Sequence, residues 1–153
     1  MNDTNLISIE RLGPPAVSRE EPNGTLHIWS RPPIVLTRIR GHGTKAIAEQ
    51  LVRHYRAHYE QYEAVVTINE WSSVSDYDPE SRKILQQLTR EMRGKQKEII
   101  IHLGKAHSLI QGVVRTTVKA LTLFHPMNIE IYDDTAEFET RVSEILTKYH
   151  QDE

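Results

Sequence analysis

The amino-acid sequence predicts a single α/β domain with a mixed β-sheet of about five strands and about four helices. The first observation is a pair of strand-like runs at residues 26–30 and 34–40, separated by an Arg-Pro-Pro turn. The second is that helix-like and strand-like segments then alternate to the end of the chain, an order typical of parallel strands with crossover helices. The third is that 153 residues without cysteine suffice for a core that needs no disulfides. The predicted domain spans residues 25–150.

The first 24 residues are predicted to form a flexible arm that precedes the domain. They contain Pro14, Pro15 and Pro22 and the turn-rich sequence Glu-Glu-Pro-Asn-Gly, a composition typical of a linker. Proline lacks a backbone donor, so these residues disfavour a central strand. We therefore expect the sheet to begin after Gly24.

The first regular elements are predicted to be a β-hairpin followed by a helix. Two strands at residues 26–30 and 34–40 flank the prolines, which suit a hairpin connection. Thr44 can then cap a helix by accepting one of its unpaired first-turn N–H groups. Apolar residues at helical spacing extend this amphipathic helix to about residue 61. The β-branched run at residues 64–69 is typical of a buried strand.

A loop at residues 69–77 is predicted to lead into the second helix. Asp78 is the expected N-cap, Pro79 takes the first helical position, and Gly94 ends the helix. The inward-facing stripe of this helix is expected to comprise Ile84, Leu85, Leu88 and Met92.

The remaining elements are predicted to be two strands and two helices. The run Glu-Ile-Ile-Ile-His-Leu at residues 98–103 is apolar on both faces, which indicates a central strand. A helix with a broad apolar face is expected over residues 108–123, a strand over residues 127–132, and a final helix over residues 133–150.

Composition excludes several functional classes. The absence of cysteine removes thiolate nucleophiles and cysteine-ligated zinc and fits a cytoplasmic protein. We expect no membrane span, because no apolar run approaches about 20 residues. The net charge is −2, with basic residues in excess over residues 25–127 and acidic residues in excess over residues 128–153. The basic residues are spread over several helix faces without interleaved aromatics, so we expect no nucleic-acid binding.

Three features of the sequence bear on chemistry. His54 and His58 have the helical spacing of a metal pair, but spacing identifies no third ligand, so we expect no metal and no cofactor. Lys105 and His107 lie at a strand-to-helix turn that could hold an anion or a small ligand. No nucleophile-elbow motif is present and no motif ties serine, histidine and acid together, so the chain is not expected to be an enzyme.

The order of these elements resembles the STAS family, the fold of anti-sigma-factor antagonists, over about residues 25–147. The likeness is greatest to bacterial SpoIIAA-like proteins with a Trp…Tyr-Asp-x-Glu-x-Arg-x-x-Leu pattern. The residues that carry it here are Trp71, Tyr77, Asp78, Glu80, Arg82 and Leu85.

The resemblance implies a non-enzymatic regulatory module in bacterial signalling that binds another protein, or a second copy of itself, through the 69–77 loop and the helix after it. Trp71 and Tyr77 would anchor the partner, Asp78 would fix the helix, and Arg82 and Lys83 would supply charge. Ser75 lies on the same surface.

In the antagonists of this family, partner binding is switched by phosphorylation of a serine at the start of the helix that corresponds to the one after the 69–77 loop. The corresponding position here is Asp78, whose charge is permanent at neutral pH. Ser72, Ser73 and Ser81 remain as candidate phosphorylation sites nearby.

Two alternatives remain open. Some STAS-like relatives resemble lipid-transfer domains of the SEC14 type, which implies a small-ligand or lipid-binding module that uses Lys105 and His107. The last alternative is a hydrolase built on histidine or acidic residues near the ends of the predicted strands at residues 64–69 and 98–103.

Overall fold

Six strands form one mixed sheet in the order of the sequence. The computed structural model describes residues 9–92, 94–104, 111–112, 114–116, 118–119 and 128–150. The strands are β1 (Val17–Glu21), β2 (Gly24–Arg31), β3 (Ile34–Gly43), β4 (Val65–Tyr77), β5 (Gln96–His102) and β6 (Ile129–Tyr132). The first three pair antiparallel, and β3 to β6 pair parallel. This confirms the predicted α/β class and mixed sheet, with one strand more than expected.

The additional strand, β1, lies within the segment that was expected to be an arm. Val17 pairs with Ile28 of β2, and the hairpin turns at Pro22 and Asn23. A short 3-10 helix, η2 (Ile9–Arg11), precedes it, and the side chains of Ile9 and Leu12 are buried. The arm prediction was therefore wrong for residues 9–24, because the prolines there end and join elements rather than prevent them.

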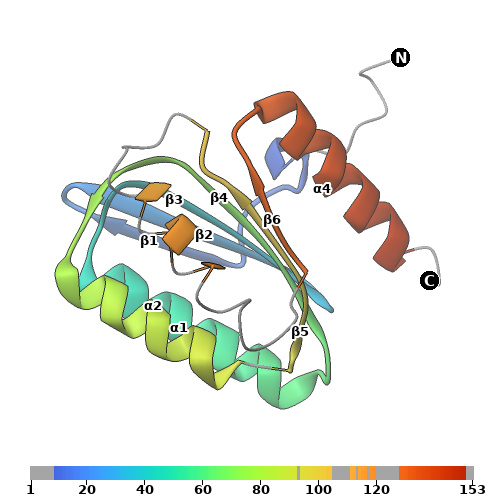
Figure 1. The fold of residues 1–153 in the computed structure, drawn as a ribbon, viewed down its shortest axis with the longest axis horizontal. Coiled ribbons are helices and arrows are strands. Elements are labelled where there is room, and N and C mark those ends of the chain that lie inside the picture. The colour runs from blue at the N-terminus through green and yellow to red at the C-terminus, as the bar shows by residue number, and fades with distance from the viewer. Residues whose placement is uncertain are drawn as a thin grey trace.

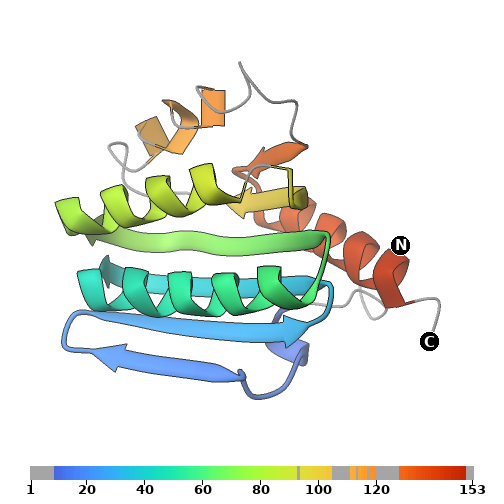
Figure 2. The same cartoon turned by 90° about the horizontal axis from the view of Figure 1, so that it is seen from below.

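Two helices cover one face of the sheet and a third covers the other. Figures 1 and 2 show α1 (Lys45–Gln61) and α2 (Pro79–Glu91) side by side on one face and α4 (Thr135–His150) on the opposite face. The β3–α1–β4 and β4–α2–β5 connections step across the sheet in the same direction, so right-handed crossovers place both helices on one side. The buried apolar residues consequently form two large clusters, one on each face of the sheet, and a smaller third cluster of Ile99, Ile101 and Leu103.

The strand β4 is longer than predicted. Residues 70–77, expected to be a loop, continue the strand and pair with β3 up to Gly43 and Tyr77, whereas β5 ends at His102 opposite Glu70. The register shifts next to Glu70, where its carboxylate accepts the N–H and the hydroxyl of Ser72 at 2.9 and 2.5 Å. In the described chain this segment has one strand partner, β3, and it is rich in polar residues. Its polar composition is the reason why the sequence predicts a loop here.

The helix α4 is held to the sheet by an ion network. The guanidinium of Arg141 donates to Glu98 of β5 at 2.9 Å and to Glu130 of β6 at 3.0 Å, and Tyr149 donates to Glu98 at 2.9 Å. The carboxylate of Glu98 is buried, so these bonds replace the water that it loses. Sequence spacing alone does not reveal this network.

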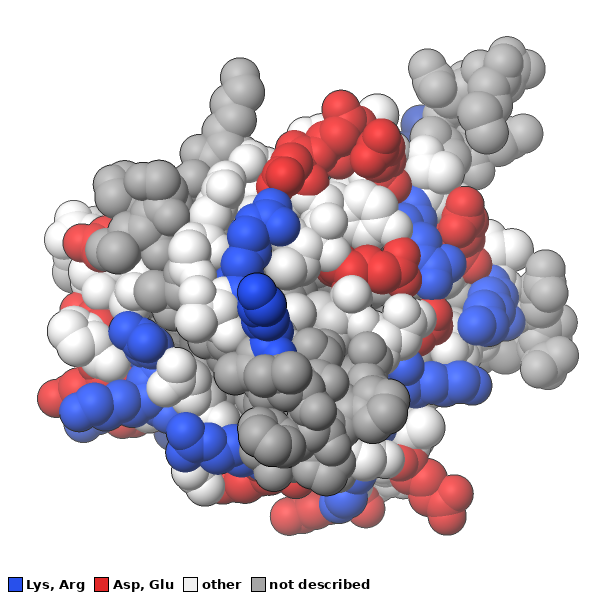
Figure 3. Space-filling view, in the orientation of Figure 1, with Lys and Arg blue, Asp and Glu red and all other residues white. Residues whose placement is uncertain are grey.

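Charges of both signs alternate over the surface. Figure 3 shows acidic and basic side chains interspersed, with acidic ones gathered at the top of the view. Of the acidic residues between β6 and α4, Asp133 pairs with Arg115 at 3.0 Å. An acidic residue of the C-terminal part of the chain is therefore paired with a basic residue of the preceding part.

Part of the predicted helix at residues 108–123 lies outside the described residues. Residues 111–112, 114–116 and 118–119 are helical. Across the portions of the chain that are described, no helix combines the length and apolar character that crossing a bilayer requires.

Candidate functional site

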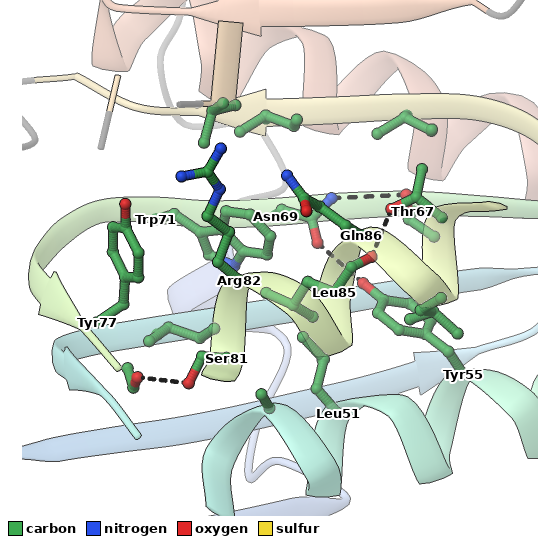
Figure 4. A pocket seen from close by; sticks show the side chains of 18 of the residues that line it. Leu51, Tyr55, Thr67, Asn69, Trp71, Tyr77, Ser81, Arg82, Leu85 and Gln86 are labelled. Atoms are coloured by element: carbon green, nitrogen blue, oxygen red, sulfur yellow. Dashed lines mark hydrogen bonds between the residues drawn. The ribbon is translucent and has the colours of Figure 1, made fainter. Parts of the chain in front are cut away.

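An apolar cavity of about 200 Å³ lies between α2 and the sheet. Its base is the α2 face of β4 and β5, one wall is α1, and the helical residues Val114 and Val118 border the opposite side. Most of its lining is aliphatic or aromatic, contributed by Ile47, Leu51, Trp71, Val74, Tyr77, Leu85, Leu88, Met92, Ile99 and Ile101, among others. Figure 4 shows this pocket from close by.

The two aromatic residues that were predicted to anchor a partner line this pocket. Trp71 and Tyr77 are half-buried, and both pack against the apolar core beneath α1 and α2. The indole N–H of Trp71 donates to the hydroxyl of Thr37 at 3.3 Å, which fixes the ring over β3. These rings therefore contribute to an internal wall.

A buried polar network forms part of the pocket floor. Asn69, 4% exposed, accepts hydrogen bonds on Oδ1 from the hydroxyls of Thr37 and Tyr55, both at 2.9 Å. Its amide donates to the carbonyl of Ile100 at 3.2 Å. Burial raises the pKa of the Tyr55 hydroxyl above its usual value, so it remains a donor. The network is satisfied internally and holds the floor rigid.

Polar side chains line the pocket along the N-terminal and middle turns of α2 and near its C-terminal end. Arg82 and Gln86 project from α2 on the side away from Leu51 and Tyr55 (Figure 4). At the other end, Gln96 begins β5, and its carboxamide donates weakly to the sulfur of Met92 at 3.7 Å. The pocket is thus mainly apolar, with a few polar side chains in its lining.

Asp78 stands at the N-cap position of α2 but does not cap that helix. Its side chain makes no cap bond to α2; Oδ1 is 2.7 Å from Nε2 of His42, and Oδ2 accepts the backbone N–H of Lys45 at 2.9 Å. The hydrogen bond with His42, followed by that from Lys45, lowers the pKa of Asp78. The capping prediction was wrong in this respect, because the strand pairing of β3 and β4 brings the start of α1 within reach of the carboxylate. Thr44 caps α1 as predicted, accepting from Ile47 at 3.1 Å.

The candidate phosphorylation sites differ in accessibility. Ser81 is 4% exposed and its hydroxyl donates to the carbonyl of Gly43 at 2.9 Å. A kinase cannot reach this hydroxyl in the folded protein, which contradicts its selection. Ser72 is half-buried and bound to Glu70, whereas Ser73 is exposed.

Of the other predicted contact residues, Ser75, Arg82 and Lys83 are exposed. Lys105 and His107 lie outside the described residues. Their predicted role in ligand binding remains a prediction.

The sequence did not reveal a buried histidine–carboxylate pair on the α4 face. Nδ1 of His102 lies 2.8 Å from Glu70, and its ring stacks on Phe138 with centroids 4.7 Å apart. His102 is 2% exposed. The available signal was that both polar residues follow apolar strand runs and are paired in register.

The histidines of α1 stack on each other with ring centroids 5.3 Å apart. His58 is buried and its Nε2 lies 3.4 Å from the hydroxyl of Ser30. Desolvation lowers the pKa of both imidazoles, and the proximity of His54 lowers that of His58 further. Both side chains are therefore stabilised in the neutral form.

No protein-family model and no curated protein sequence matches this chain. Among solved structures, it is similar to an uncharacterized protein of the DUF3478 family from Shewanella loihica PV-4, described as having a SpoIIAA-like fold. The two share a TM-score of 0.55 and 11% identity, over 85% of this chain and 98% of that one. This chain has a SpoIIAA-like fold. The SpoIIAA-like fold agrees with the resemblance found in the sequence, and at this identity the comparison establishes the fold alone.

Proposed function

We propose that this protein is a binding module that takes an apolar small molecule into the pocket between α2 and the sheet. The observation that carries the proposal is that Trp71 and Tyr77, the residues expected to contact a partner, both line this pocket. Concave, mainly apolar pockets with a few polar groups are the usual form of small-molecule sites.

The size of the cavity limits the ligand. A dry apolar cavity of about 150 Å³ is enough to bind benzene. The cavity of about 200 Å³ here is larger, so it would take the apolar part of a ligand that exceeds benzene in size. The free energy of binding would come from removing apolar surface from water, at about 25 cal/mol per Å².

A pair of matched variants on α2 tests the proposal. Leu85 lines the pocket, whereas Gln87 is exposed on the same helix and does not line it. We expect the neutral dye phenylnaphthylamine to bind the wild-type chain saturably, about tenfold more weakly to Leu85→Trp, and unchanged to Gln87→Trp. Equal binding to both variants, with melting temperatures close to wild type, would refute the proposal. Native mass spectrometry of the freshly purified protein would supply an independent check for a retained ligand.

Recognition of another protein is a second candidate, favoured by the edge of β4. Within the described chain, residues 71–77 pair with β3 on one side and with no strand on the other. Such an edge can accept a strand from a partner. The exposed side chains of Ser75, Arg82 and Lys83 lie at this end of the sheet or on the adjoining helix.

The two candidates are separable by one pulldown. A Ser75→Arg, Lys83→Glu double variant alters the exposed surface and leaves the pocket lining intact. If a partner protein binds there, this variant loses it while Leu85→Trp retains it. The opposite pattern would assign partner binding to the pocket and remove the second candidate.

A further inference from the structure

We propose that the ligand of this pocket is a linear amphiphile that lies along α2, with an anionic head group at Arg82 and a hydroxyl or N–H group at Gln96. This inference rests on the proposed function and specifies the chemical class of its ligand. It is carried by the positions of Arg82 and Gln96, two polar residues far apart along the lining of a mainly apolar pocket.

The first observation is an unpaired acceptor inside the pocket. Oε1 of Gln96 is buried and has no hydrogen-bond partner among the residues that the structure describes, while the amide nitrogen of the same side chain makes one weak bond to the sulfur of Met92. Buried polar atoms in folded proteins are nearly always paired, and leaving one unpaired is unfavourable. Because Gln96 lines the pocket, a ligand hydroxyl or N–H at that end would supply the missing donor.

The second observation is the position of Arg82. Its side chain lines the pocket and is exposed to solvent, and it belongs to the N-terminal part of α2, where the helix dipole also favours a negative charge. The nearby acid Glu80 is bound by Lys45, with Nζ to Oε2 at 3.4 Å. The guanidinium is therefore placed to pair with a carboxylate or similar anion at the mouth.

The third observation is the separation of these two groups. The ten steps along the chain from Arg82 to Met92 correspond to a rise of about 15 Å along the helix, and Gln96 contacts Met92. Between them α2 contributes the apolar side chains of Leu85 and Leu88 to the lining, together with the polar side chains of Gln86 and Thr89. An extended chain satisfies both ends, whereas a compact ring reaches one of them.

Dodecanoate and its ω-hydroxy derivative provide the test, by displacement of phenylnaphthylamine from the full-length chain. For wild type we expect the ω-hydroxy acid to bind about fivefold to tenfold more tightly, the effect of one net hydrogen bond. We expect Gln96→Leu to abolish this advantage. If that variant does not fold, Gln96→Met serves in its place.

A matched pair of charge-removing substitutions tests the proposed contact of the ligand's anionic head group. Arg82→Gln should weaken both acids about fivefold, while Lys83→Gln, an exposed neighbour that does not line the pocket, should leave both unchanged. Equal affinities of the two acids for wild type, or an advantage that persists in Gln96→Leu, would overturn the inference while dye binding still supports the pocket. If the dye also fails to bind, the proposed function fails with it.

Discussion

The carboxylate of Asp78, the residue directly before α2, accepts the first backbone N–H of α1 from Lys45 at 2.9 Å. One side chain therefore joins the starts of the two helices that enclose the pocket. The hydroxyl of Ser81, which bonds the carbonyl of Gly43, adds a second link between the same segments.

Removal of this carboxylate should loosen the pocket and lower stability in a pH-dependent way. The pKa of Asp78 in the folded protein lies below its usual value, so its contribution is fully present above the pKa of the unfolded chain and is lost as pH falls through the folded pKa. We expect Asp78→Ala to melt at a lower temperature than wild type at pH 7, and the difference to shrink below about pH 4. A constant difference across this range would contradict the assignment.

Loss of the Asn69 side chain should destabilise the protein strongly. Asn69→Leu leaves the hydroxyls of Thr37 and Tyr55 and the carbonyl of Ile100 without their partner in a buried site. We expect the free energy of unfolding to fall by about 3 kcal/mol. Urea unfolding monitored by circular dichroism measures it, and a change below about 1 kcal/mol would show that this network is not important for stability.

Acidification should lower the stability of the folded protein by protonating the stacked histidines of α1. Because the pKa values of His54 and His58 are lowered, the unfolded chain binds protons first, and stability falls as pH drops below about 6.5 toward the folded pKa values. We expect a His54→Gln, His58→Gln variant to lose less stability than wild type between pH 7.5 and 5.5. Parallel pH profiles of the two proteins would exclude this pair as the origin of the effect.

The contribution of the ion network under α4 to stability should require both Arg141 and Glu98. Arg141→Met leaves the carboxylate of Glu98 buried without its guanidinium, and we expect a loss of about 2 kcal/mol. Adding Glu98→Leu should recover much of this loss, because the buried charge is then absent. A double variant no more stable than Arg141→Met, measured by urea unfolding, would argue against this account.

The regular parts of the fold could be predicted from the sequence because their apolar spacing is regular. Such patterns predict the helices that begin after Thr44 and Asp78 and the buried strand β5. β1 could not be predicted in the same way, because its alternation of Val17 with charged residues is short and flanked by prolines.

The site could be predicted only in part. Trp71 and Tyr77 stand out in the sequence as aromatic residues in a polar segment, but the direction in which they face depends on the length of β4, which the polar composition conceals. Gln96 gave no signal, since a single glutamine at the start of a strand is ordinary in sequence. Its relevance depends on the lack of a hydrogen-bond partner for Oε1 within the described part of the chain.

The most direct test of the pocket uses tryptophan fluorescence, because the two tryptophans lie on opposite faces of the sheet. Trp71 lines the pocket, whereas Trp29 is buried in the core beneath α4. In a Trp29→Phe chain, bromonaphthalene, an apolar contact quencher, should quench Trp71 saturably; in a Trp71→Phe chain it should leave Trp29 largely unaffected. Absence of saturable quenching of Trp71 in the folded protein, or equal quenching of both residues, would contradict the existence of an apolar ligand site at this position.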